Sequence, residues 1–189
     1  MTTQTTQTPT ATDTDTEAEV EAGTTGITAA DIEAGVAAAE TARTRLDFAT
    51  ASRKTYRAIA ALGMAAREGL DPALVELVQI RASHLNGCAY CLHMHTNDAR
   101  KAGEHEDRLH LVPLWREARH FYTPKERAAL ALTESLTLPQ GGVSDAVYTE
   151  AATHFDDHEL AQLIALICTI NTWNRVALAT GKVAGTDER

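Results

Sequence analysis

Two cysteines and a histidine form the most compact group of reactive side chains in the sequence. Cys88 and Cys91 are three residues apart, and His95 follows the second cysteine by four positions. On a helix, these spacings place all three side chains on one face. Asn86-Gly87 interrupts the preceding helical pattern, so we expect both thiols in the first turn of a new helix, where free N–H groups favour a thiolate. Such a pair suits two-electron redox chemistry, in which one sulfur becomes a sulfenic acid and the other condenses with it.

Other chemistries of this cluster are less well supported by the sequence. Zinc needs about four ligands, whereas Cys88, Cys91 and His95 supply three and no second C-x-x-C motif completes the set. Leu92 stands where a haem-attachment motif requires histidine, and no βαβ pattern supports a thioredoxin-like fold. Zinc binding, and two cysteines that merely pack as small hydrophobic residues, remain as alternatives.

Two further residues are of interest because of their apolar surroundings. Glu76 lies among Val75, Leu77 and Val78, and burial there would raise its pKa and make it a proton acceptor. Spacing alone favours the alternative, in which Glu76 faces solvent on an amphipathic helix. Cys168, the third cysteine, lies in an apolar run and is expected to be an inert core thiol.

The composition limits the classes of protein to consider. The 189 residues suffice for one domain with a sizeable core, and 44% of them are hydrophobic but only 5% aromatic, which favours packed helices. The formal charge of -9 without a basic patch argues against nucleic-acid binding. We find no apolar stretch long enough to span a membrane and no secretory leader, and we expect a cytoplasmic protein.

Composition, capping residues and helix breakers divide the chain into a tail and a series of helices. Residues 1–26 are Thr-rich and acidic and are predicted to be disordered. Residues 27–185 are predicted to form one all-α domain of about seven to nine helices, with no sheet. Caps and breakers place helices at 72–85, 88–101, from 124 to a break at 139–142, from 144 onward, and at 157–180.

The residues around the cysteines resemble a known family. The stretches that carry the resemblance are 76–83, 86–91, 95–96, 98–103, 115–118, 126–130 and 171–175. Together they resemble the alkylhydroperoxidase D-like (AhpD-like) core of the carboxymuconolactone decarboxylase superfamily, over roughly residues 45–180. A glutamate twelve residues before the C-x-x-C motif and a histidine four residues after it make the resemblance specific.

The resemblance implies a fold, an activity and a role for each site residue. It implies an AhpD-like helical bundle, usually oligomeric, with an antioxidant thiol-dependent peroxidase activity. By position, Cys91 would be the peroxidatic thiol and Cys88 the resolving one, with Glu76 and His95 in the proton relay. We expect a hydroperoxide substrate, a dithiol or redox-protein reductant and a homo-oligomer, without metal, cofactor, nucleic acid or membrane.

Tyr90 departs from the best-known relatives, which carry histidine directly before the second cysteine. A phenol titrates near pH 10 and cannot act as a base at neutral pH, although it can donate a hydrogen bond. The relay is therefore expected to be simpler or slower here. Two alternative functions stay open: a non-catalytic redox-responsive protein, and a decarboxylase-like lyase that uses Glu76 and His95 as acid and base.

Overall fold

Helices account for all of the regular secondary structure that is described. The computed structural model describes residues 26–42, 45–138 and 140–186, so most of the predicted disordered tail lies outside the described residues. Within these ranges the all-α prediction is confirmed, with nine α-helices, two short 3-10 helices and no strand. The α-helices are α1 (Ala29–Thr41), α2 (Phe48–Ala51), α3 (Arg53–Ala65), α4 (Pro72–Leu85), α5 (Ala89–Lys101), α6 (Glu106–Leu111), α7 (Pro124–Thr137), α8 (Asp145–His154) and α9 (Asp157–Thr180).

The helix boundaries follow the capping residues seen in the sequence. Asp71 accepts a hydrogen bond from the backbone N–H of Leu74, which starts α4. Thr123 and Glu126 form a reciprocal capping box at the start of α7. Gly181 ends α9 in the left-handed conformation at φ 62°, which glycine adopts without steric cost. The predicted helices are confirmed to within a residue or two.

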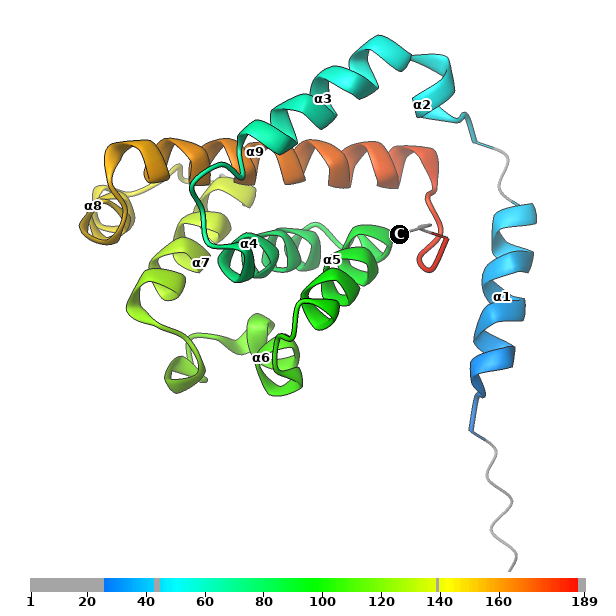
Figure 1. Cartoon of the computed structure of the whole chain (residues 1–189), viewed down its shortest axis with the longest axis horizontal. Coiled ribbons are helices and arrows are strands. Elements are labelled where there is room, and N and C mark those ends of the chain that lie inside the picture. The colour runs from blue at the N-terminus through cyan, green and yellow to red at the C-terminus, as the bar shows by residue number, and fades with distance from the viewer. Residues whose placement is uncertain (1–25, 43–44, 139, 187–189) are drawn as a thin grey trace, which may run out of the picture.

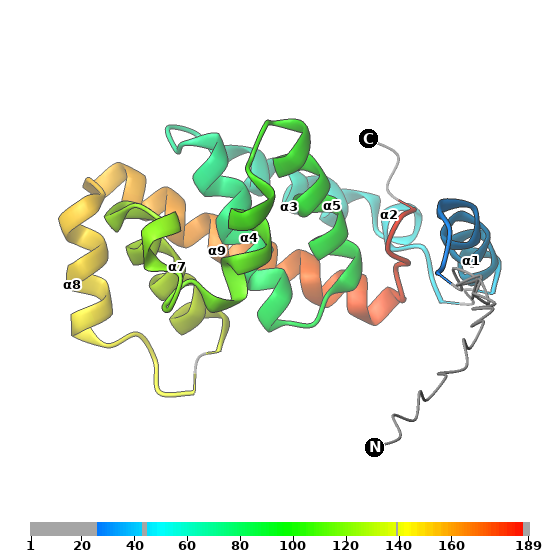
Figure 2. The same ribbon diagram turned by 90° about the horizontal axis from the view of Figure 1, so that it is seen from below.

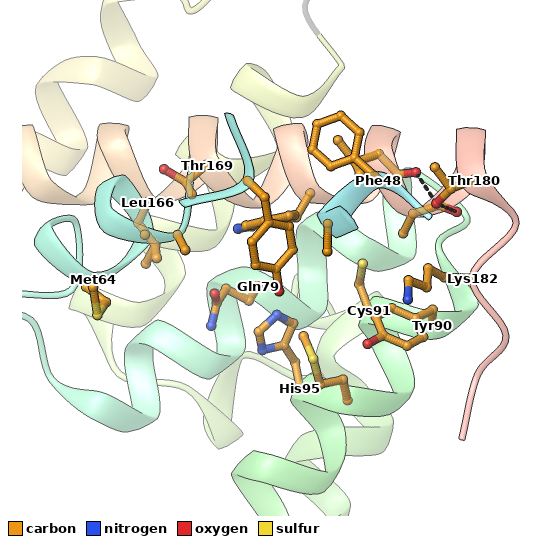
Figure 3. A pocket seen from close by; sticks show the side chains of 18 of the residues that line it. Phe48, Met64, Gln79, Tyr90, Cys91, His95, Leu166, Thr169, Thr180 and Lys182 are labelled. Atoms are coloured by element: carbon orange, nitrogen blue, oxygen red, sulfur yellow. Dashed lines mark hydrogen bonds between the residues drawn. The ribbon is translucent and has the colours of Figure 1, made fainter. Parts of the chain in front are cut away.

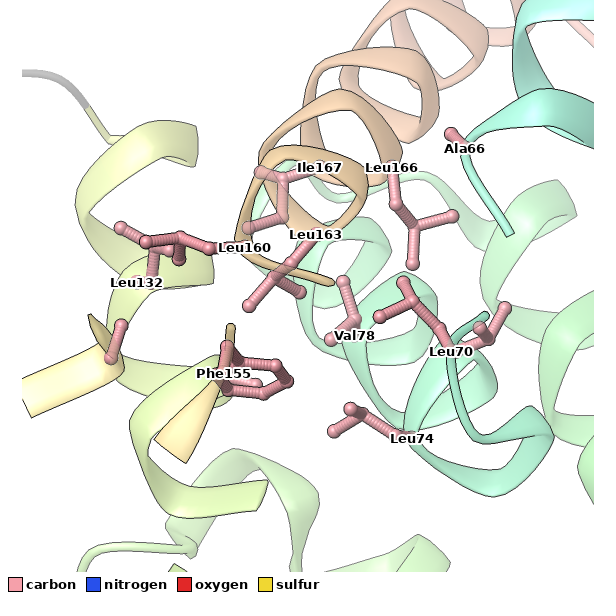
Figure 4. Close-up of a cluster of buried hydrophobic side chains, with 13 residues drawn as sticks. Ala66, Leu70, Leu74, Val78, Leu132, Phe155, Leu160, Leu163, Leu166 and Ile167 are labelled. Atoms are coloured by element: carbon pink, nitrogen blue, oxygen red, sulfur yellow. The ribbon is translucent and has the colours of Figure 1, made fainter. Parts of the chain in front are cut away.

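The longest helix, α9, runs along the whole body and organises the packing around it. In Figure 1, α3 lies along one side of α9, and α4 and α5 lie along the other. The main hydrophobic core fills the space between α4, α7, α8 and α9 (Figure 4). Leu163 and Ile167 of α9 and Val78 of α4 are completely buried there. A second apolar cluster, which includes Leu77 and Trp115, joins α4 to the segment between α5 and α7.

The length of α9 corrects one prediction. Within the part of the chain that the structure describes, α9 alone is long and apolar enough to cross a membrane by length and composition. Half of its most apolar window is buried inside the protein. A central core helix meets the same criterion, so burial of α9 accounts for its composition without a membrane.

Cys168 corrects another prediction, because it is exposed rather than buried. The buried face of α9 is formed by residues such as Leu163, Ile167 and Ile170. Cys168 lies within the same apolar run but on the outward face of the helix. Runs of apolar letters therefore do not show which face of this helix packs against the core.

The N-terminal helices lie at one end of the body. Figures 1 and 2 show α1 standing beside the other helices from both directions, and none of its residues is buried. The Nη1 atom of Arg45 donates hydrogen bonds to the backbone oxygens of Leu178 and Ala179, at 2.9 and 3.1 Å. This guanidinium satisfies carbonyl groups at the end of α9 and attaches the N-terminal segment to the body.

Candidate active site

The turn between α4 and α5 positions the two cysteines. Gly87, at φ 65°, adopts the left-handed conformation that reverses the chain after α4. The N–H of Cys88 then donates to the backbone oxygen of Ser83 at 2.9 Å, which closes the turn. As a result α5 packs back along α4.

The two sulfur atoms lie close together. Cys88 Sγ is 2.8 Å from Cys91 Sγ, and it also accepts the backbone N–H of Cys91 at 3.4 Å. Cys88 is the N-cap of α5 in extended backbone conformation, so it precedes the first turn rather than lying within it as predicted. A disulfide bond is about 2.05 Å long, so bond formation requires the sulfurs to approach by less than about 1 Å.

The thiols of Cys88 and Cys91 have different pKa values. The thiol of Cys91 and backbone N–H groups donate to Cys88 Sγ and lower the pKa of Cys88 to about 7. The pKa of Cys91 is raised, because its proton is shared with Cys88 and its side chain is buried. When the pair is ionised, the negative charge therefore lies mainly on Cys88, while Cys91 holds the shared proton.

The amide of Asn174, on α9, forms a hydrogen-bond network next to the two cysteines. Asn174 is completely buried, and its Nδ2 donates to the Ser83 hydroxyl at 3.1 Å. Its Oδ1 accepts a hydrogen bond from Asn86 at 2.8 Å. The Asn174 side chain also lowers the pKa of both cysteines by hydrogen bonding. This network links the thiol pair to the central helix.

Glu76 and His95 form a buried acid–base pair between α4 and α5. Glu76 Oε2 lies 2.8 Å from His95 Nδ1, and the two residues are 9% and 3% exposed. Glu76 therefore faces the interior, and its solvent-facing alternative is wrong. Arg67 Nη1 lies 3.5 Å from Glu76 Oε1, and Arg67 Nη2 donates to Gln79 Oε1 at 3.0 Å. The carboxylate is thus held between an imidazole and a guanidinium.

A cavity of about 390 Å³ lies beside Cys91 and His95. Cys91 and His95 project into it from α5 (Figure 3), whereas Cys88 does not line it. Its walls are mostly apolar side chains of α3 and α9, and its polar lining includes Arg67, Gln79 and Lys182. The volume suits a small organic molecule. A ligand in this cavity would meet the Cys91 sulfur beside an imidazole.

The chain is similar in sequence to a known protein family. The family model of the Carboxymuconolactone decarboxylase family matches residues 53–135, which include both cysteines and the acid–base pair. The uncharacterized protein YdfG of Bacillus subtilis (strain 168) is 46% identical over 110 residues, 58% of this chain and 74% of YdfG. The chain belongs to the carboxymuconolactone decarboxylase superfamily.

Solved structures place this member of the superfamily with the AhpD-like proteins. Protein ATU0492 of Agrobacterium tumefaciens, of unknown function and provisionally assigned to the antioxidant defence protein AhpD, superposes with a TM-score of 0.72. It is 34% identical, and the match covers 76% of this chain and 99% of that one. The debrominase Bmp8 shares the fold at a TM-score of 0.58 and 19% identity, over 69% of this chain and 67% of Bmp8.

In this AhpD-like protein the four predicted site residues come together as two hydrogen-bonded pairs, Cys88 with Cys91 and Glu76 with His95. Sequence reasoning missed the residues that support them, which are Arg67, Gln79 and Asn174. Arg67 lies in the turn between α3 and α4, Gln79 on α4 and Asn174 on α9. For Gln79 and Asn174 the signal in the sequence was a polar residue within an apolar helical pattern, whereas Arg67 in the turn carried none.

The zinc alternative is not supported by the geometry. Among the described residues, the possible ligand atoms that lie within 4.8 Å of one another belong to Glu76, His95 and Asp98, a set without cysteine. The closest contact in that set is the hydrogen bond between Glu76 and His95. The thiol pair is therefore not part of a three-ligand metal set.

Tyr90 lies at the edge of the same cavity. Its ring is partly buried, and Lys182 Nζ lies 5.9 Å from the ring centroid, within the range of a cation–π contact. The phenol thus occupies the place where better-known relatives carry an imidazole. Its effect on the rate of proton transfer stays a prediction.

Proposed function

We propose that this protein is a thiol-dependent peroxidase that reduces hydroperoxides through a Cys88–Cys91 dithiol–disulfide cycle. One observation carries the proposal. A sulfur pair only 2.8 Å apart presents Cys91 to an apolar cavity that His95 also lines. The assignment of the similar protein ATU0492 to antioxidant defence supports the same activity.

In the first step, the shared proton moves from Cys91 to Cys88, which leaves Cys91 as the thiolate. The short distance between the sulfurs permits this transfer without movement of heavy atoms. Cys91 Sγ attacks the terminal oxygen of the hydroperoxide, so the S–O bond forms while the O–O bond breaks. The sulfur is oxidised to a sulfenic acid, and the departing alkoxide takes a proton from His95 Nε2 to become an alcohol. Glu76, on Nδ1, stabilises and orients the imidazole.

In the second step, the Cys88 thiol attacks the sulfenic sulfur of Cys91. The S–S bond forms, the S–O bond breaks, and the hydroxide leaves with the Cys88 proton as water. A dithiol or a redox protein with two thiols then reduces the disulfide and is itself oxidised to a disulfide. The protons released by the reductant restore the shared proton and His95. Each cycle thus converts one hydroperoxide and one dithiol into an alcohol, water and a disulfide.

Steady-state peroxide consumption with dithiothreitol as reductant tests this proposal. We expect turnover by the wild-type protein, its loss in Cys91→Ser and Cys88→Ser, and unchanged turnover in Cys168→Ser. Cys168 is a matched control because it lies on the outer face of α9. Unchanged activity in Cys91→Ser would overturn the proposal.

The same assay separates the alternative functions. A redox-responsive protein without catalysis would form the Cys88–Cys91 disulfide but show negligible turnover with excess peroxide and reductant. A lyase that uses Glu76 and His95 would keep its activity on a lactone substrate after both cysteines are changed to serine.

A further inference from the structure

Gln79 has a buried hydrogen-bond donor without a partner in the described part of the chain. The residue is 5% exposed and lines the cavity with Cys91 and His95. Its Nε2 atom is buried and has no hydrogen-bond partner among the described residues. Buried amide groups are nearly always hydrogen-bonded, because an unsatisfied donor costs about 1–3 kcal/mol. An unsatisfied donor in the wall of a cavity therefore suggests that a ligand supplies the acceptor.

The orientation of this amide is fixed by its other end. Arg67 Nη2 donates to Gln79 Oε1 at 3.0 Å, and because a guanidinium has no acceptor, the oxygen must face Arg67 and the nitrogen must be the free end. Figure 3 shows the amide in the cavity wall near His95, and the amide comes from α4 as Glu76 does. The donor is thus held on the rigid helix that also carries the carboxylate of the proton relay.

We infer that Gln79 is a substrate-binding residue whose Nε2 donates a hydrogen bond to the carbon-bound oxygen of an organic hydroperoxide. This inference rests on the proposed peroxidase function. The carbon-bound oxygen becomes the alkoxide when the O–O bond breaks, so a neutral donor there strengthens its hydrogen bond as negative charge develops. His95 then supplies the proton to the same oxygen. Nε2 is itself buried, so contact with the ligand requires side chains of the wall to move, and the unbranched side chains of Met64 and Met94 can do so.

The apolar part of the cavity favours a substrate with a hydrocarbon body over hydrogen peroxide. Tyr56, Leu166, Trp173 and Val176 line it from α3 and α9. Their contacts hold the organic group, and Gln79 fixes the oxygen at one end of it. Removal of the amide donor is therefore expected to affect organic hydroperoxides more than hydrogen peroxide.

Binding of an unreactive alcohol isolates this hydrogen bond from the chemistry. Cumyl alcohol keeps the carbon-bound oxygen of cumene hydroperoxide but cannot oxidise a thiol. We expect Gln79→Met and Gln79→Glu to weaken its binding by roughly 3- to 10-fold, the effect of one lost neutral hydrogen bond, as measured by ligand-observed NMR on the full chain. The matched control is Thr169→Val, since Thr169 lines the same cavity but its hydroxyl already donates to the Ala165 oxygen at 2.7 Å.

Two kinetic readouts complete the test. We expect kcat/KM for cumene hydroperoxide to fall by a similar factor in both Gln79 variants, with a smaller loss for hydrogen peroxide. The pH profile of cysteine alkylation should stay unchanged in the uncharged Gln79→Met variant, which a merely structural role of Gln79 would not predict. Equal alcohol affinity in the wild type and both variants would overturn the inference, as would a shifted alkylation profile that accounts for the lost rate.

Failure of the peroxidase proposal can be distinguished from failure of the inference about Gln79. If the wild-type protein consumes no hydroperoxide, the peroxidase proposal falls. Weaker alcohol binding by the Gln79 variants would then still support the amide as a ligand-binding group, whereas unchanged binding would overturn both.

Discussion

His95 Nδ1 lies 2.8 Å from Glu76 Oε2 across the contact between α4 and α5. Both side chains are buried, and His95 lines the cavity into which Cys91 projects. One ring nitrogen is thereby committed to the carboxylate, and the other is left for an exchangeable proton. The contact between these two residues therefore fixes which nitrogen of the imidazole can exchange a proton at the thiol site.

Replacement of Glu76 by glutamine should slow catalysis without removing the hydrogen bond to His95. The amide keeps the shape of the carboxylate but cannot stabilise a positive imidazole. We expect kcat/KM to fall about 100-fold, the lower end of the range for general acid–base groups, because His95 itself remains. Steady-state kinetics checks this, with thermal unfolding to show that the variant is folded. A variant with wild-type kcat/KM would remove Glu76 from the relay.

The thiol pair should titrate well below an ordinary cysteine. Because the pKa of Cys88 is lowered from 9.0 to about 7, its thiolate is populated in the folded protein between these pH values, where a free thiol is still protonated. In Cys168→Ser, which removes the exposed third thiol, we expect the alkylation rate with iodoacetamide to reach its half-maximum near pH 7 and then level off. In Cys91→Ala, which lacks the thiol that donates to Cys88, the midpoint should move upward. A rate in Cys168→Ser that keeps rising through pH 9 would contradict the assigned charge.

Asn174 should stabilise both the thiolate and the fold. Its amide lowers the pKa of both cysteines and hydrogen-bonds Ser83 and Asn86. We expect Asn174→Ala to move the alkylation midpoint to higher pH and to reduce the free energy of unfolding by about 1–3 kcal/mol, because buried polar groups lose their partner. An unshifted midpoint in a folded variant would show that the amide does not act on the sulfurs.

The core around α9 should respond strongly to truncation. Leu163 is completely buried between α9 and its neighbours, so Leu163→Ala should lower the free energy of unfolding by roughly 2–5 kcal/mol. Leu62→Ala is the matched control, since Leu62 is 48% exposed on α3 and its loss should cost less than about 0.5 kcal/mol. Urea denaturation of the two variants measures the difference. Equal effects would mean that α9 does not organise the core.

Local signals in the sequence predicted the helices well. Side-chain caps such as Asp71 and Thr123 act on backbone N–H groups only two or three residues away, so they are visible without any tertiary information. The spacing of Cys91 and His95 likewise gave their shared helical face. The placement of Cys88 just before α5 was missed because a cap and a first-turn residue differ only in backbone angles.

Contacts between different helices could not be predicted from the sequence in the same way. The burial of Glu76 depends on α5 packing against α4, and spacing alone favoured a solvent-facing side chain. Arg67 reaches Glu76 from the end of α3, and Asn174 reaches the turn after α4 from α9. No local pattern encodes these contacts. The exposure of Cys168 was missed for the same reason, since an apolar run does not specify which face packs.

The most direct test of the central claim is to trap the sulfenic acid after a single turnover. Reduced Cys88→Ser protein is mixed with one equivalent of cumene hydroperoxide and dimedone, and the adduct is located by peptide mass spectrometry. We predict an adduct on Cys91, none on Cys168, and a Cys88–Cys91 disulfide when the wild-type protein is treated without dimedone. An unmodified Cys91 in this experiment, or an adduct on Cys88 in the Cys91→Ser variant at the wild-type rate, would contradict this prediction.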